Sequence, residues 1–238
     1  RIIIGVLLVY LFVGVLGHGD HKASRVLSSF SFKPPFFPEA GLSAVPGWET
    51  RGSTQISSDK IALTHAKSGI SGILVNKRPF FLKTVELTLE FKIHSTESRG
   101  GDGLVLWLAD QPARPGPNFG GPDKWNGIAV VIDNFSNDGL STISLHFNDG
   151  TRRYDFDTDG DSTRLGTCRY KLRNVKDLSA LHLYIENDKV NILIDENNDG
   201  NWSRCMPATQ VLMPSRYFFS ISASTGIAND IHEVTRLY

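Results

Sequence analysis

A loop rich in oxygen-bearing side chains follows an apolar segment near the middle of this 238-residue chain. Residues 128–132 are all apolar, and Asp133, Asn134, Asn137 and Asp138 come directly after them. Ca²⁺ prefers oxygen ligands from carboxylates, amides and backbone carbonyls. A buried strand that ends in such a loop therefore predicts a cation site, and this donor set favours Ca²⁺.

Two other loops carry carboxylates in similar surroundings. Asp102 stands between two glycines, the second of which directly precedes the apolar residues 104–107, and residues 155–160 contain three aspartates. Loops at strand ends are positioned by the rigid sheet beneath them. Asp159 is therefore a candidate to complete the cation site that Asp133 begins.

Two segments match the first half of an EF-hand loop, residues 155–160 and residues 195–200. An EF-hand needs a bidentate Glu at position twelve, where this chain has Gly166 and Met206. Neither segment is predicted to be an EF-hand. The second is typical of a solvated turn rich in Asp and Asn.

Glu86 and Glu90 offer an enzymatic alternative. Two carboxylates on one strand face are the acid and nucleophile of retaining glucan hydrolases. In those enzymes the position between them is normally Asp, and here it is Thr88. Two glutamates without that Asp are more typical of a polar exterior face. No nucleophile elbow, phosphate-binding Walker loop or His-Glu-x-x-His motif occurs, and the seven histidines are interpreted as surface or hydrogen-bonded residues.

The elements that must position these loops have the two-residue period of β-strands. Residues 85–93 alternate apolar and polar side chains, which predicts one face in the core and one in water. Further strands are predicted at 104–107, 128–132, 143–147, 181–185, 190–194 and 217–223, with a hairpin turn at Glu186 to Lys189. The run 217–223 is more continuously apolar than the others, which favours a strand buried on both faces. The pattern predicts an all-β antiparallel β-sandwich.

Composition and the N-terminal residues limit the compartment and the partners. The 25 basic and 25 acidic residues balance, so charge gives no case for nucleic acid or for an anionic membrane surface. The apolar run after Arg1 predicts a signal peptide over residues 1–19, with a short membrane anchor as the alternative. In a secretory lumen, Cys168 and Cys205 are expected to form one disulfide. Asn201 begins a glycosylation sequon; Asn134 begins another, which we expect to be unused because it lies in the cation loop.

Taken together, the motifs of residues 27–238 resemble those of the L-type, or legume-like, lectins of the early secretory pathway. The resemblance is carried by Gly101-Asp102-Gly103-Leu104, Trp125-Asn126-Gly127, residues 133–139, Tyr154-Asp155, Asp159-Gly160, the cysteine pair and residues 221–226. It implies a concanavalin A-like sandwich, or jelly roll, that binds high-mannose N-glycans on glycoprotein cargo with the help of Ca²⁺. It also implies a location in the endoplasmic reticulum, the intermediate compartment or the Golgi, and a membrane anchor and oligomerisation stalk beyond Tyr238.

The resemblance assigns roles to individual residues. The implied cation ligands are Asp133, the backbone carbonyl of Phe135, Asn137 and Asp159. Asp102 and Asn137 are the implied partners of sugar hydroxyls, together with the backbone at Gly226. In the family the peptide bond before the sugar-binding Asp is cis, which here is the bond between Gly101 and Asp102.

Two departures from the family pattern fall in the implied sugar pocket. Phe156 replaces a sugar-binding His, so its ring either stacks on an apolar sugar face or closes the pocket. Ile227 and Ala228 follow Gly226 where the family has Gly-Leu, which removes a flexible backbone position. Three hypotheses remain: a Ca²⁺-dependent mannose-type lectin, a lectin-fold interaction module that keeps the metal, and a β-glucan hydrolase using Glu86 and Glu90.

Overall fold

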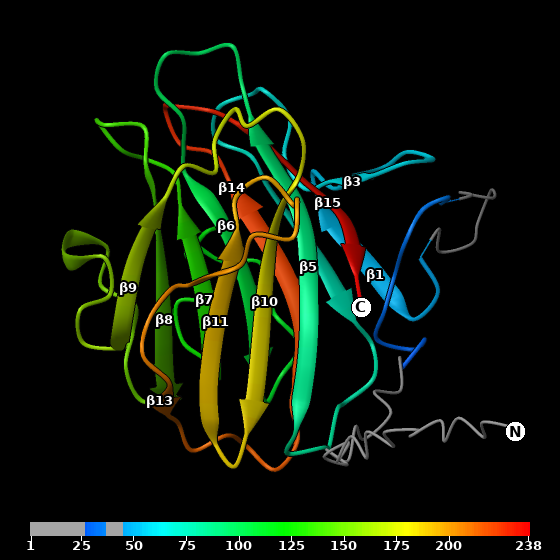
Figure 1. The fold of residues 1–238 in the computed structure, drawn as a ribbon, viewed down its shortest axis with the longest axis vertical. Helices are drawn as coiled ribbons and strands as arrows, with labels where there is room; N and C mark the ends of the chain where they lie inside the picture. Colours follow the sequence, from blue (N-terminus) through cyan, green and yellow to red (C-terminus); the bar gives the residue numbers. More distant parts are fainter. Residues whose placement is uncertain (1–26, 37–44) are drawn as a thin grey trace, which may run out of the picture.

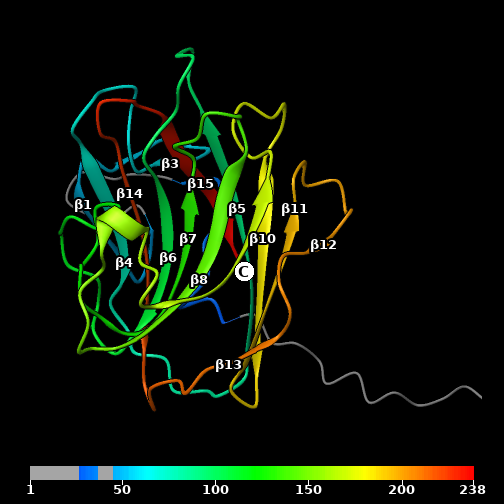
Figure 2. The same ribbon diagram turned by 90° about the vertical axis from the view of Figure 1, so that its left-hand side faces the viewer.

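The structure is a computed structural model that describes residues 27–36 and 45–238 (Figure 1). This part of the chain is a sandwich of two antiparallel β-sheets, which confirms the predicted fold class. Figure 2 shows the two sheets as separate layers. The predicted signal peptide lies outside the described residues. Within them, no helix has the length and apolar character needed to cross a membrane.

The order of strands along each sheet differs from their order in the chain. The seven-stranded sheet runs β1 (Trp48–Gly52), β4 (Ser71–Asn76), β14 (Phe218–Ser224), β6 (Gly103–Ala109), β7 (Asn126–Asp133), β8 (Ser141–Asp149), β9 (Arg164–Tyr170). The eight-stranded sheet runs β12 (Ser203–Arg204), β11 (Lys189–Asp195), β10 (Ser179–Glu186), β5 (Val85–His94), β15 (Ile231–Leu237), β3 (Ile61–Ala62), β2 (Gln55–Ile56), and β13 (Thr209–Gln210) pairs with β11. A short 3₁₀ helix, η1 (Phe156–Thr158), lies between β8 and β9.

The predicted hairpin and the predicted doubly buried strand are both present. β10 and β11 pair from Ala180 opposite Asp195 to Glu186 opposite Lys189. The turn residues Asn187 and Asp188 have φ angles of 51° and 59°, the left-handed values that a two-residue hairpin turn requires. β14 is buried along most of its length, which confirms the prediction for residues 217–223.

The prediction of one wet face on β5 is wrong for two of its residues. Glu86 is exposed, but Thr88 and Glu90 are buried. β5 lies between β10 and β15, whose side chains cover this face. His182 of β10 hydrogen-bonds the Thr88 hydroxyl at 3.0 Å, and Arg236 of β15 donates to the Glu90 carboxylate at 3.0 Å.

The main core lies between the two sheets, and a second apolar cluster covers the other face of the seven-stranded sheet. β6 and β7 contribute to both, because alternate side chains along a strand point to opposite faces. Leu106 faces the main core, while Trp107 packs against Trp125 with ring centroids 5.4 Å apart. The second cluster includes loop residues such as Tyr154. Loop residues thus help to cover the outer face of the seven-stranded sheet.

A disulfide joins the two sheets along one side of the sandwich. Cys168 lies in β9, at the end of the seven-stranded sheet, and Cys205 directly follows β12, at the end of the eight-stranded sheet. Their Cα atoms are 5.2 Å apart. Closing this loop of 37 residues contributes about 4 kcal/mol in the chain-entropy model.

Two histidines are buried in the fold and do not lie at its surface. His146 contacts the hydroxyls of Ser144 and Thr163 at 2.8 and 3.0 Å. His232 contacts Thr64 at 2.7 Å and Asn134 at 3.1 Å. Burial lowers the pKa of His146 to about 4, with help from Arg164, and lowers the pKa of His232 to about 3, with help from His94.

Acid is therefore expected to destabilise the fold through these two histidines. Each ring stays neutral in the folded state while the unfolded chain takes up a proton below pH 6.5, so stability is lost as the pH falls below that value. The loss between pH 7 and pH 5 is about 2 kcal/mol per histidine. Urea unfolding of His146→Gln and His232→Gln at both pH values should show this difference reduced. His65→Gln, at a half-buried histidine, is the matched control; equal pH sensitivity in all variants would contradict the prediction.

Candidate functional site

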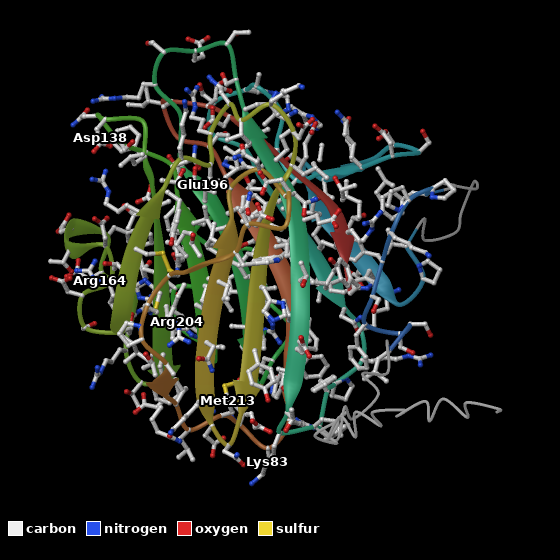
Figure 3. The ribbon with its side chains drawn as sticks, viewed as in Figure 1. Lys83, Asp138, Arg164, Glu196, Arg204 and Met213 are labelled. Atoms are coloured by element: carbon white, nitrogen blue, oxygen red, sulfur yellow. A yellow bond between two sulfur atoms is a disulfide. The ribbon has the colours of Figure 1, made fainter. Side chains whose placement is uncertain are left out.

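Three strand ends meet at one end of the seven-stranded sheet. β6 begins at Gly103, which is paired with Asp133 at the end of β7 on one side and with Ser224 at the end of β14 on the other. Antiparallel pairing thus brings together loops that are more than a hundred residues apart in the chain. The Phe135–Asp138 loop lies at the upper end of the molecule, where Figure 3 labels Asp138.

The loop after β7 and the segment after η1 enclose a cavity of about 400 Å³. All four implied cation ligands line it, namely Asp133, Phe135, Asn137 and Asp159. Asp159 is held by a left-handed backbone with φ of 50° at the end of η1. The Asp155 carboxylate caps η1 by accepting from the Asp157 amide at 3.0 Å. The segment that resembles half of an EF-hand loop therefore forms a capped turn, which places Asp159 near Asp133.

The electrostatics of this cavity favour a bound cation. Burial, together with the charges of Asp159 and Asp102, raises the pKa of Asp133 to about 6, against the lowering effect of a 2.8 Å hydrogen bond from the Phe135 amide. Burial and the charges of Asp159 and Asp133 also raise the pKa of Tyr154. A divalent cation would compensate the desolvation and the mutual repulsion of these carboxylates.

The donor set suits Ca²⁺ better than a transition metal. Across residues 27–36 and 45–238, no three His, Cys, Asp or Glu side chains gather into a metal cluster. The four implied ligands offer two carboxylates, one amide and one backbone carbonyl, all oxygen donors of the kind that Ca²⁺ takes along with water. The residues present therefore fit a Ca²⁺ site completed by solvent or ligand oxygens.

Asp102 lies beside this cavity at the start of β6. The peptide bond between Gly101 and Asp102 is cis. The Asp102 carboxylate accepts hydrogen bonds from the Ser224 hydroxyl at 3.1 Å and from the backbone amide of Gly226. Burial nevertheless raises the pKa of Asp102. Its carboxylate is thus fixed in place and poorly hydrated, which suits recognition of a sugar hydroxyl.

Gly226→Ala is expected to displace Asp102. A Cβ atom on Gly226 would lie 2.7 Å from Oδ1 of Asp102, so the carboxylate must move to make room. The neighbour that moves is a side-chain tip, so the fold should lose little stability. Affinity for mannose should fall about tenfold or more, equivalent to one lost charged hydrogen bond, while calorimetric Ca²⁺ binding is retained. Unchanged sugar affinity would show that Gly226 is not part of the sugar site.

The residues that depart from the family pattern lie around this pocket without closing it. The Phe156 ring packs against Tyr154 with centroids 5.1 Å apart, and the side chain is 50 % exposed. It is absent from the lining of the cavity. Ala228 lies near Gly101 and the Phe135 ring, because a Cβ on Gly101 would lie within 3.4 Å of both. The Ile227 side chain is 99 % exposed and available to a ligand.

Arg99 is a neighbour of the cation cavity that the sequence did not indicate. Its guanidinium donates to Oδ1 of Asn137 and lies 5.0 Å from the centre of the Phe135 ring. Oδ1 of Asn137 is the oxygen implied as a cation ligand. Cation binding at that atom must therefore compete with the Arg99 contact or rearrange it.

A buried polar network beneath the site was also not predicted. The Asp230 carboxylate accepts from the Gly101 amide at 3.2 Å, from Arg173 at 3.0 Å and from the Asn134 side chain. Burial raises the pKa of Asp230 despite the opposing effect of Arg173. The network ties the Asp102 and Asp133 loops to β15. Because the Asn134 amide nitrogen is bonded here, glycosylation of Asn134 remains unexpected, whereas Asn201 is exposed and stays a predicted acceptor.

Comparison with known proteins gives one family and a consistent set of relatives. The model of the legume-like lectin family matches residues 23–238. Human vesicular integral-membrane protein VIP36 is 32% identical over 201 residues, which cover 82% of this chain and 56% of that protein. Human ERGIC-53 is 29% identical over 212 residues, which cover 86% of this chain and 41% of that protein.

The solved structures agree with this match. The VIP36 exoplasmic/lumenal domain in its Ca²⁺- and mannose-bound form has a TM-score of 0.81 and 30% identity, covering 88% of this chain and 89% of that domain. The chain spans about half the length of the curated relatives it matches.

Proposed function

This chain belongs to the legume-like lectin family, and from that premise we propose that it binds high-mannose N-glycans on glycoprotein cargo in a Ca²⁺-dependent manner. One observation supports the proposal most strongly. Asp102, which is bonded to the Gly226 amide, lies beside a cavity that is lined by Asn137, Asp133 and Asp159. The relative VIP36 has been solved with Ca²⁺ and mannose.

Each part of the site has a distinct role in this proposal. Asp133, Asp159, Asn137 and the carbonyl of Phe135 would hold Ca²⁺, which supplies the positive charge that fixes the loop after β7. Asp102 accepts hydrogen bonds from sugar hydroxyls, held by Ser224 and Gly226. The amide nitrogen of Asn137 remains available as a donor to the sugar. The exposed Ile227 and Phe156 flank the pocket, where apolar sugar faces would contact them.

The proposed place of action is the lumen of the early secretory pathway, from the endoplasmic reticulum to the Golgi. The disulfide between Cys168 and Cys205 supports an oxidising compartment. We also propose a membrane anchor and an oligomerisation stalk C-terminal to the lectin domain. VIP36 is named as a vesicular integral-membrane protein, which supports the membrane anchor.

A second candidate function is a lectin-fold interaction module that keeps the metal but has lost or altered glycan binding. Ile227 and Ala228 favour it, since they replace the Gly-Leu of the family pattern beside Asp102. The β-glucan hydrolase receives less support from the structure. Glu90 is buried and paired with Arg236, while Glu86 is exposed, so the two carboxylates do not form an accessible pair. We therefore propose a non-enzymatic protein.

Calorimetric titration of residues 27–238 with a high-mannose oligosaccharide, with Ca²⁺ and then with chelator, tests the proposal. Binding that requires Ca²⁺ is expected. Stabilisation by Ca²⁺ without any glycan binding would instead favour the interaction module. Hydrolysis of a β-glucan that is lost in Glu86→Gln and Glu90→Gln would favour the enzyme.

A further inference from the structure

The Asp230 carboxylate is bonded to both loops of the candidate site. It accepts from the Gly101 amide at 3.2 Å, in the loop of residues 95–102 that ends at the proposed sugar ligand. It also accepts from the side-chain amide of Asn134, in the loop of residues 134–140 that carries two of the implied cation ligands. We call these segments the glycan loop and the cation loop. One fully buried carboxylate thus joins them.

Asp230 is itself held in place by residues outside both loops. Nε of Arg173 lies 3.0 and 3.1 Å from the two carboxylate oxygens. The backbone of Arg173 forms a bridge with Ile93 of β5, which anchors this cation to the eight-stranded sheet. The Thr64 hydroxyl donates to the backbone carbonyl of Asp230 at 2.9 Å. Asp230 therefore offers a fixed position to which each loop is bonded.

The ion pair of Arg173 and Asp230 also packs against the glycan loop. A Cβ atom on Gly100 would overlap both Nε of Arg173 and Oδ2 of Asp230, so only glycine leaves room for the pair. The Arg173 guanidinium also donates to the carbonyl of Glu97 at 2.7 Å. The pair therefore contacts the glycan loop at several points before its last residue.

Other contacts also join the two loops. The backbone amide of Asn134 donates to the carbonyl of Asp102 at 3.0 Å. Arg99 of the glycan loop donates to Oδ1 of Asn137 in the cation loop. Arg99 is exposed, so water competes for its hydrogen bonds, whereas the bonds to Asp230 are buried. We therefore expect Asp230 to provide the stronger side-chain link between the loops.

We propose that Asp230 is a positioning residue that couples the two loops, so that cation binding at the cation loop also orders the glycan loop and Asp102. A cation that fixes the cation loop fixes Asn134, and Asn134 shares the Asp230 carboxylate with the Gly101 amide. Order gained in one loop lowers the entropy cost of ordering the other. The consequence for glycan affinity rests on the proposed function, whereas the ordering of the glycan loop by Ca²⁺ does not.

Amide hydrogen exchange of residues 27–238, followed by NMR with chelator and with Ca²⁺, tests this proposal. The domain is suitable because both sheets and their core lie within it, and it matches the solved VIP36 lumenal domain. In the parent domain, Ca²⁺ should slow exchange about fivefold or more at residues 99–102 as well as at residues 134–137. Asp230→Asn should keep the effect at residues 134–137 and lose most of it at residues 99–102.

Asn134→Ala is a second variant, because it removes the bond to the cation loop and leaves the ion pair of Asp230 in place. It should lose the same part of the effect, and it decides the question if Asp230→Asn does not fold. Glu90→Gln is the matched control for stability, since Glu90 is a buried carboxylate paired with Arg236 outside both loops. Arg99→Gln removes the exposed link between the loops. Both controls should keep the Ca²⁺ effect at residues 99–102.

The outcomes separate this coupling from the alternatives. A Ca²⁺ effect confined to residues 134–137 in the parent, or retained at residues 99–102 in Asp230→Asn, would overturn the proposal. Loss of the effect in Arg99→Gln alone would overturn it in favour of Arg99. A parent domain that does not bind Ca²⁺ would overturn it together with the cation site.

Calorimetry with a mannose oligosaccharide at saturating Ca²⁺ distinguishes this proposal from the proposed function. Asp230→Asn should lower the glycan affinity about fivefold or more, and Glu90→Gln should leave it unchanged. If the parent binds no glycan while Ca²⁺ still orders residues 99–102 through Asp230, the proposed function fails and the coupling stands. If the parent binds glycan and Asp230→Asn binds it equally well, the coupling fails and the proposed function stands.

Discussion

Asp133→Asn is expected to stabilise the metal-free domain and to remove its response to Ca²⁺. Burial and the neighbouring carboxylates raise the pKa of Asp133 from 3.8 to about 6 in the metal-free fold. Because the folded-state pKa is the higher one, the charged carboxylate opposes folding above pH 6, and this cost disappears as the pH falls toward 3.8. The shift corresponds to at most about 3 kcal/mol at neutral pH. Asparagine keeps the side-chain shape and removes the charge.

Urea unfolding at neutral pH, with chelator and with Ca²⁺, measures both effects. The parent domain should gain about 2.7 kcal/mol when Ca²⁺ is present at a hundred times its dissociation constant. Asp133→Asn should gain almost nothing and should also lose glycan binding, because Asn137 is no longer fixed. Asp138→Asn is the control, since Asp138 lines the same cavity but is bonded to Arg169. A full Ca²⁺ response in Asp133→Asn would show that the ligand set is wrong.

Asp102→Asn is expected to abolish mannose binding while Ca²⁺ binding continues. The Asp102 carboxylate is held by Ser224 and Gly226 but is not an implied cation ligand. Losing two charged hydrogen bonds to sugar hydroxyls corresponds to about 3 kcal/mol, or a loss of affinity of about a hundredfold or more. Stability should not fall, because burial already raises the pKa of this carboxylate and disfavours its charge.

Calorimetry with a mannose oligosaccharide and, separately, with Ca²⁺ distinguishes these outcomes. Asp110→Asn is the matched control, because Asp110 follows the opposite end of the same strand, β6. Retained mannose affinity in Asp102→Asn would place the sugar contact elsewhere. Loss of Ca²⁺ binding as well would show that the substitution disturbs the whole loop rather than the sugar contact alone.

Much of the fold can be predicted from the two-residue alternation of apolar and polar side chains. The site can be predicted from the strands that end in Asp and Asn side chains. Alternation in residues 85–93 predicts β5, and the apolar run 128–132 predicts β7 with its acidic end. The burial of Glu90 could not be predicted, because it depends on Arg236 of a strand that is adjacent in the sheet but distant in the chain. The period of a strand shows which residues share a face, but not what covers that face.

The supporting residues of the site escaped prediction for the same reason. Asp230 and Arg173 meet beneath the Gly101 amide through tertiary contacts that have no sequence spacing. Arg99 lies in a loop without a strand pattern, so nothing in its neighbours indicated the contact with Asn137. Residues that bind a ligand can be recognised in the sequence from their side-chain type. Residues that position them can be recognised only once the fold is known.

The disulfide between β9 and the segment after β12 makes the two sides of the sandwich unequal. On that side the last strands of the two sheets are held together by a covalent bond. On the other side the sheets end in β1 and in the two-residue strands β2 and β3, which are held by non-covalent contacts. Local opening should therefore start at β1 to β3. Amide hydrogen exchange is expected to be faster there than in β8 and β11. The two sheets would then separate first along the side away from the disulfide, while the disulfide keeps β9 and the segment after β12 together.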